Sequence, residues 1–150
     1  VLVNSLITEF RHLSHLRQIV LKSNPGLKGT IPPEWMELPK LRTLDLKLSG
    51  LSGSIPTEIG TLELLETLDL GSTCLTGTIP PQLSNAFRIR TLSLSSVSGL
   101  TGSIPSSIWE LQNLEKLNIQ ATSLTGSIPA DGLAKLSYLE YINLGGNALT

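Results

Sequence analysis

Two aspartates, Asp45 and Asp69, occupy matching places in the sequence, because each lies in a Thr-Leu-Asp-Leu segment. If these segments form adjacent strands, the carboxylates lie roughly one strand spacing apart, about 4.8 Å. Such a pair could perform acid–base chemistry or hold a cation. The matching places further along the sequence carry neutral polar residues, Ser93, Asn118 and Asn143. We therefore expect a polar ladder along a sheet and no catalytic pair.

Two histidines, His12 and His15, could turn both imidazoles toward one metal ion, but no third ligand stands nearby in sequence. We expect surface histidines and no metal site. Cys74 is the only cysteine, which excludes an intrachain disulfide, and no basic residue lies near it to activate the thiol. We expect it to be a half-buried structural residue. No phosphate-binding glycine loop or Ser-His-Asp grouping occurs, so the sequence predicts neither catalysis nor a cofactor.

The composition excludes two classes of partner. Charged residues make up 15% of the 150 residues, and the formal net charge is −1. This balance supplies no basic field for nucleic acid and no polybasic patch for a membrane surface. No apolar run approaches the roughly 20 residues that a membrane span needs. Leucine makes up about a fifth of the residues, which is typical of a repeat with leucine at fixed places.

Residues 75–80, Leu-Thr-Gly-Thr-Ile-Pro, represent a segment that recurs through the sequence. Its isoleucines fall 24 or 25 residues apart, at Ile31, Ile55, Ile79, Ile104 and Ile128. A fixed period of this size predicts a stack of coils. Each copy follows a nine-residue frame, Leu-x-x-Leu-x-Leu-x-x-Asn, whose positions are numbered one to nine below. The frame begins at Leu16, Leu41, Leu65, Ile89, Leu114 and Leu139.

The frame predicts a short strand and the segment after it predicts a turn. Leu44 and Leu46 alternate with polar residues, as in a half-buried strand. Stacking six such strands in register gives a parallel sheet. The glycine that follows permits a tight turn, and the proline excludes a long helix. Ile59, Leu62 and Leu65 then recur every three residues, which favours a 3₁₀-like or irregular turn.

We expect a single domain over residues 1–150. Its partial repeats lie at 1–15 and 139–150, and its full repeats at 16–40, 41–64, 65–88, 89–113 and 114–138. Open ends of such a stack expose apolar rows and strand edges. We therefore expect further repeats or caps on both sides in the full chain.

The combined pattern, Leu-x-x-Leu-x-Leu-x-x-Asn-x-Leu-x-Gly-x-Ile-Pro, resembles the plant-type leucine-rich repeat. This repeat is found in ectodomains of receptor-like kinases and receptor-like proteins and in polygalacturonase-inhibiting proteins. The resemblance implies a β-dominated α/β solenoid, curved and right-handed, with a parallel sheet on its concave face. It also implies a second short strand at Leu-x-Gly-x-Ile-Pro and 3₁₀ turns on the convex face.

The sequence departs from the family at position nine, where asparagine bonds neighbouring backbone. The family's asparagine is present at Asn24 and Asn147. We expect part of its hydrogen bonding to be supplied by Ser49, Thr73 and Thr122, whose hydroxyls can bond backbone groups, and none by the apolar side chain of Val97. For Trp109 two interpretations remain open, packing against the next coil and an exposed lateral contact surface.

The concave face is the expected binding surface. We expect a hot spot at Tyr141, Asn143 and Lys116, because aromatic anchors dominate interface energies. Lys22 and Lys47 stand beside the aspartates, either as a solvated, mutually neutralising cluster or as ligand contacts. The candidate residues are Gln18, Lys22, Thr43, Asp45, Lys47, Thr67, Asp69, Ser93, Lys116, Asn118, Gln120, Tyr141 and Asn143.

These features predict a non-catalytic recognition module for a protein or peptide ligand, within a larger receptor-like or inhibitor-like protein. A carbohydrate ligand is possible on this face, whereas nucleic acid and direct membrane contact are not expected. A structural or adhesion array and the sensor ectodomain of a membrane receptor kinase are the alternatives. The resemblance favours an extracellular or cell-surface location. The lack of Asn-x-Ser/Thr acceptors and of disulfides argues against it, so the compartment is left open.

Overall fold

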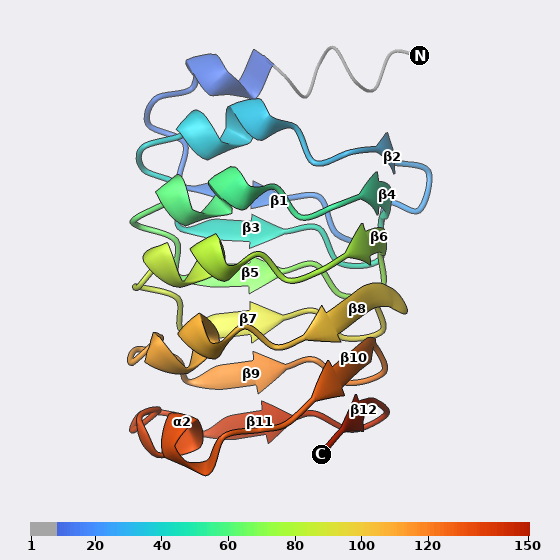
Figure 1. The fold of residues 1–150 in the computed structure, drawn as a ribbon. Coiled ribbons are helices and arrows are strands. Elements are labelled where there is room, and N and C mark those ends of the chain that lie inside the picture. Colours follow the sequence, from blue (N-terminus) through green and yellow to red (C-terminus); the bar gives the residue numbers. More distant parts are fainter. Residues whose placement is uncertain (1–8) are drawn as a thin grey trace.

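The computed structural model describes residues 9–150 as a stack of coils that form two parallel sheets (Figure 1). The first sheet contains β1 (Gln18–Val20), β3 (Thr43–Asp45), β5 (Thr67–Asp69), β7 (Thr91–Ser93), β9 (Lys116–Asn118) and β11 (Tyr141–Asn143) in that order. The second contains β2 (Lys28–Gly29), β4 (Gly50–Gly53), β6 (Cys74–Gly77), β8 (Gly99–Ser103), β10 (Ser123–Gly126) and β12 (Ala148–Leu149). The solenoid expected from the period is confirmed. The partial repeat expected at 1–15 lies mostly outside the described residues.

Short helices form the side of the stack opposite the first sheet (Figure 1). Five are 3₁₀ helices: η1 (Glu9–His12), η2 (Pro33–Glu37), η3 (Thr57–Thr61), η4 (Pro81–Asn85) and η5 (Ser106–Glu110). A proline precedes each of them from η2 onward, because its fixed φ suits a helix start. The one α-helix described, α2 (Ala130–Ala134), takes the place of a 3₁₀ helix in the coil that precedes β11. Within residues 9–150, no helix is long and apolar enough to span a bilayer.

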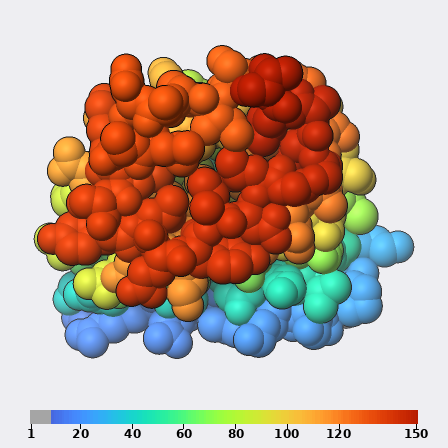
Figure 2. All heavy atoms as spheres, turned by 90° about the horizontal axis from the view of Figure 1, so that it is seen from below, coloured from blue at the N-terminus to red at the C-terminus, as the bar shows by residue number. Residues whose placement is uncertain are grey.

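The core consists of rows of leucine and isoleucine that run through the stack. Position four of each frame lies in register across the first sheet. Leu44 and Leu68 are fully buried, whereas Ile142, in the last coil, is 41% exposed. Figure 2 views the molecule from this C-terminal end, where the last coil forms the surface. Each buried leucine contributes about 1.5–3 kcal/mol, so stability comes from stacking.

Backbone hydrogen bonds join the coils beyond the strands. The Leu46 N–H donates to the Asp69 carbonyl at 2.8 Å, and the Leu48 N–H donates to the Gly71 carbonyl at 2.9 Å. The same two bonds recur between each pair of successive coils. To direct its N–H this way, position eight adopts a positive φ, at Ser23, Leu48, Ser72, Ser96, Ala121 and Gly146. Nothing in the sequence pattern indicates this turn, because five of these six residues carry side chains.

The repeated glycines explain the turn of the second sheet. Gly77 and Gly102 have φ values of 88° and 79°, which side-chain-bearing residues rarely adopt. A Cβ at Gly102 would also lie 3.2 Å from the Thr78 methyl carbon of the preceding coil. Glycine therefore permits both the conformation and the close stacking.

Position nine bonds only in part as expected. The Asn147 side-chain amide donates to Ile119 O at 2.8 Å in the preceding coil and to Leu144 O at 2.9 Å. Thr73 donates to Leu70 O at 2.7 Å. The expectation for Ser49 was wrong, because its hydroxyl is buried and has no hydrogen-bond partner among residues 9–150.

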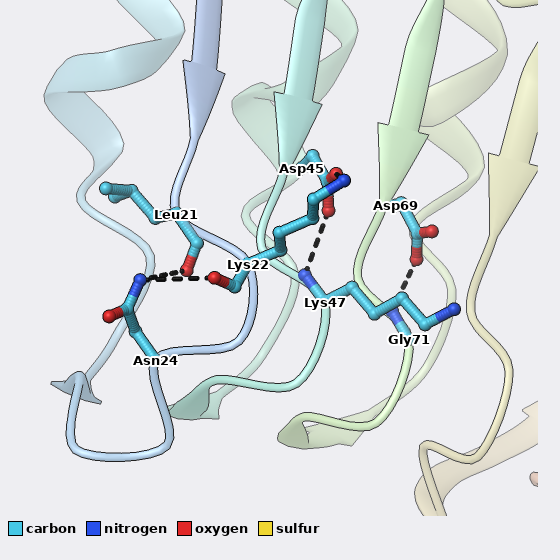
Figure 3. Close-up of polar contacts among 7 residues, drawn as sticks. All are labelled: Leu21, Lys22, Asn24, Asp45, Lys47, Asp69 and Gly71. Atoms are coloured by element: carbon cyan, nitrogen blue, oxygen red, sulfur yellow. Dashed lines mark hydrogen bonds and ion pairs between the residues drawn. The ribbon is translucent and has the colours of Figure 1, made fainter.

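The three remaining residues at position nine, Thr122, Asn24 and Val97, differ in burial and in their hydrogen bonds from coil to coil. Thr122 donates to Ile119 O at 3.3 Å and also bonds the Asn147 side chain. The Asn24 amide bonds only its own turn, at Leu21 O and Lys22 O (Figure 3). Val97 is fully buried in the core.

Two expectations about exposure are resolved by the packing. Trp109 is 2% exposed and packs against Gly132 of the next coil, so the lateral contact surface is excluded. Cys74 is exposed, and the expectation of a half-buried thiol was wrong. Cys74 faces solvent because successive strand residues face opposite sides and the adjacent Leu75 points into the core.

Ser49→Ala removes a buried hydroxyl that has no partner, so the free energy of unfolding should stay constant or rise slightly. Thr73→Val keeps the side-chain shape but leaves Leu70 O unpaired, and should lower that free energy by about 1–2 kcal/mol. Urea unfolding of both variants measures the difference. Equal losses would show that the Ser49 hydroxyl is also bonded.

Candidate ligand-binding face

The solvent side of the first sheet, called the concave face here, is built from positions three, five and seven of each frame. Side chains at these positions point away from the core because residues alternate along a strand. The register places Asp45 beside Asp69 and Lys116 beside Tyr141. All thirteen candidate residues belong to these positions. Gln18, Lys22, Lys47, Lys116 and Tyr141 are exposed, and Thr43, Asp45, Thr67, Asp69, Asn118, Gln120 and Asn143 are half-buried.

Ser93 is the exception, because it is only 8% exposed. It lies in register between Asp69 and Asn118, whose longer side chains flank it. The expectation that Ser93 is available to a ligand is therefore not supported by its burial.

Position five has a structural role that the pattern alone did not reveal. Asp45 Oδ1 accepts the Lys47 N–H at 3.3 Å, and Asp69 Oδ1 accepts the Gly71 N–H at 2.9 Å (Figure 3). Asn118 and Asn143 accept the N–H two residues on in the same way. An asparagine or aspartate that closes a turn with its own side chain is a common local device. The two carboxylates thus support backbone turns, in keeping with the expected polar ladder.

One of the two lysines neutralises an aspartate. Lys22 Nζ lies 3.5 Å from Asp45 Oδ2, and both side chains are drawn in Figure 3. Lys47 extends past the turn at Gly71 and forms no ion pair with the described residues. The Lys22 side chain is 58% exposed and the Asp45 side chain 16%, so solvent screens this pair only in part. On the N-terminal half of the face, Lys47 and Asp69 have no ion-pair partner among the described residues, which leaves one charge of each sign available.

A joined polar cluster marks the C-terminal half of the face. Asn143 Nδ2 donates to Gln120 Oε1 at 2.6 Å and to the Tyr141 hydroxyl at 3.2 Å. Tyr141 remains 44% exposed. These bonds fix the orientation of an aromatic ring that solvent can reach. Lys116, the third member of the predicted hot spot, lies in register with Tyr141 and is exposed.

Each histidine forms a short-range polar contact. His12 Nε2 lies 3.4 Å from Glu9 and accepts a hydrogen bond from Arg11 Nε at 3.3 Å. His15 contacts Ser14. Among residues 9–150, no three His, Cys, Asp or Glu side chains gather closely enough to hold a metal ion.

Two exposed surfaces outside the concave face were not predicted from the sequence. Position two carries charged residues of both signs, and Arg42–Glu66 and Arg90–Glu115 form ion pairs along the rim of the first sheet. The second sheet presents rows of serine and threonine from successive coils. Both patterns are visible once the copies are aligned, since they repeat at fixed frame positions.

The stack, its paired sheets and its polar strand face define a solenoid recognition fold. A family model described as Leucine Rich Repeat matches residues 40–62 and 64–86. The ectodomain of the receptor kinase SOBIR1 from Arabidopsis thaliana is 32% identical, with a TM-score of 0.80, over 87% of this chain and 71% of that one. The chain belongs to the plant-type leucine-rich repeat family.

Three other solved structures extend the comparison. The Arabidopsis receptor kinase HAESA, in complex with the peptide hormone IDA and the co-receptor SERK1, is 35% identical with a TM-score of 0.77, over 81% of this chain and 20% of that one. A plant ice-binding protein is 32% identical with a TM-score of 0.79, over 87% and 42%. This chain spans about a quarter of a similar TDR receptor. A comparison with curated proteins gives no match.

Asp69→Ala removes the acceptor for the Gly71 N–H and should lower the free energy of unfolding by about 1 kcal/mol. Asp69→Asn is the matched control, because asparagine closes the same turn at position 143. It should stay within about 0.5 kcal/mol of the parent protein. Urea unfolding compares the two, and an equal loss in both variants would mean that the negative charge matters more than the turn.

Proposed function

We propose that this protein is a non-catalytic recognition module that binds a protein or peptide along the concave face. The observation that carries the proposal is the bonded cluster of Tyr141, Asn143 and Gln120 at one end of an in-register polar sheet. Tyrosine supplies a large contact area with little loss of conformational freedom. The ring is already oriented, so binding costs little additional ordering.

The distribution of charge suits an extended ligand. Tyr141 lies at the C-terminal end of the face, whereas the unpaired Lys47 follows β3, the second strand from its N-terminal end. The strands between them carry one charge of each sign, Asp69 and Lys116, and otherwise neutral side chains such as Thr67 and Thr91. A peptide lying across the strands could meet an aromatic anchor at one end and a cation at the other. HAESA, a similar protein, forms a complex with a peptide hormone, which supports this class of ligand.

The absence of catalysis is part of the proposal. The carboxylates that could act as an acid–base pair, Asp45 and Asp69, are engaged by backbone N–H groups, and Asp45 is also paired with Lys22. The module would serve within a larger receptor-like or inhibitor-like protein. A purely structural array is the alternative on the same fold.

Peptides selected from a displayed random library on the parent protein provide the test. Tyr141→Ala should weaken their binding by about 2 kcal/mol or more, roughly thirtyfold in Kd, because it removes the central anchor. Tyr138→Ala is the matched control, since Tyr138 lies three residues before Tyr141 and is 65% exposed, but it occupies none of the frame positions that form the concave face. It should change binding by less than about 0.5 kcal/mol. Calorimetry measures both.

Equal affinity for the Tyr141 variant and the parent would place the peptides elsewhere and reject the concave-face site. Failure to select any peptide would favour the structural array.

Ice binding is a second candidate function, and the second sheet favours it. Thr76, Thr101 and Thr125 each donate to a glycine carbonyl of the preceding coil at 3.4 Å, which fixes their rotamers. A parallel row of exposed hydroxyls consists of Thr30, Ser54, Thr78, Ser103 and Ser127. Strand pairing repeats the groups of each row about every 4.8 Å from coil to coil, and the two rows lie on either side of the glycine turn. A rigid two-dimensional lattice suits a crystalline surface, and a similar plant protein is named for binding ice.

Thr101→Arg places a long, hydrated side chain in the middle of this lattice and should abolish any inhibition of ice recrystallisation by the protein. Gln18→Arg, on the edge strand of the first sheet, is the control and should retain the parent activity. Microscopy of annealed ice grains measures the effect. Absence of inhibition by the parent protein, or full activity of the Thr101 variant, would reject this function.

A further inference from the structure

A surface hollow of about 350 Å³ opens on the rim beside the N-terminal end of β7. Its lining consists of Glu66, Phe87, Arg88, Arg90 and Asn113. These residues come from three successive coils, at frame position two or in the loop that leads into the frame. The hollow is separate from the positions that form the concave face.

The ion pairs of the rim leave one cation unbalanced in this hollow. Glu66 is paired with Arg42, and Arg90 Nη1 lies 3.0 Å from Glu115 Oε1. Arg88 has no carboxylate partner among residues 9–150. The five lining groups together therefore carry a net charge of +1. An unpaired guanidinium between two satisfied ion pairs attracts an anion to one particular place.

Phe87 lies beside this guanidinium. Arg88 Cζ lies 5.9 Å from the centre of the Phe87 ring, within the range of a cation–π contact. Arg88 donates no hydrogen bond to residues 9–150, so its guanidinium N–H groups are available to a planar, bidentate acceptor. Phe87 itself is 51% exposed and offers an apolar wall beside these N–H groups.

Asn113 forms the opposite wall and stiffens the loop. Its Nδ2 donates to the Phe87 carbonyl at 2.8 Å across the boundary between coils. The Oδ1 atom forms no hydrogen bond with the described residues, so it can accept one from a ligand N–H. The hollow thus combines a carboxylate-binding edge, an apolar wall and an amide acceptor, which together match the chemistry of a peptide group.

We infer that this rim hollow is a second interaction site, which binds a carboxylate group of a protein or peptide partner at Arg88. The site lies outside the concave face and does not depend on ligand binding there. The carboxylate comes from the C-terminus of the partner or from one of its acidic side chains. Backbone beside that carboxylate lies against Phe87 and donates to Asn113.

The test is an NMR titration of the ¹⁵N-labelled protein with three small probes. N-acetyl-dialanine carries a terminal carboxylate, its C-terminal amide is the neutral match, and N-acetylaspartic acid amide carries its carboxylate on the side chain. Saturable shifts at the amides of Phe87, Arg88 and Asn113 are expected with one or both carboxylates and not with the neutral amide. The stronger of the two carboxylates identifies the source.

Arg88→Gln should weaken the carboxylate titration about tenfold or more, because it removes a charge-assisted hydrogen bond. Lys40→Gln is the matched control, since Lys40 is an exposed cation at the equivalent place two coils away. It should leave the titration unchanged, and the spectra themselves report folding. Equal shifts with dialanine and its amide, or undiminished binding by the Arg88 variant, would overturn the site.

Discussion

Each coil of this protein depends on its neighbour for both hydrogen bonds and burial. A strand of three residues has no stability of its own, yet its N–H and carbonyl groups are bonded across the coil boundary, as Leu46 and Leu48 show with Asp69 and Gly71. The same boundary covers the leucine of each frame. Two interactions of different kinds therefore select the same register. That agreement allows a sequence with 4% aromatic residues to form a continuous core.

The shared register also determines what the surfaces can do. Because corresponding residues stack in rows, each face repeats similar side chains from coil to coil. The proposed binding sites lie where one residue differs from the others in its row. On the concave face the change is the arrival of Tyr141 in a row otherwise occupied by glutamine, threonine and lysine. On the rim the change is Arg88, a cation in the loop before the frame, which has no carboxylate partner among the described residues and lies beside the ion pairs of position two. Departures from the repeat are thus the informative positions.

The fold was predictable because its signals are local and repeated. The Gly-x-Ile-Pro segment occurs five times at a nearly constant spacing and the strand frame occurs six times, so chance agreement is negligible. Individual contacts between side chains were less predictable, because they depend on which neighbour the next coil supplies. Ser49 and Thr73 share position nine, yet only Thr73 finds a carbonyl. Ser93 was expected to be accessible and is shielded by Asp69 and Asn118, an effect of side-chain length that alignment does not show.

The left-handed turn at position eight lowers the stability of this fold, because most of the residues there carry side chains. Leu48 and Ala121 hold φ values of 57° and 52°, whereas Gly146 adopts the same turn without a side chain. A side-chain-bearing residue in this conformation costs roughly 1–2 kcal/mol. Summed over five coils, this cost is comparable to the free energy of unfolding of a typical domain, about 5–15 kcal/mol. Substitution of glycine or asparagine at these sites would raise the melting temperature of the protein and would leave the side chains of its proposed binding surfaces unchanged.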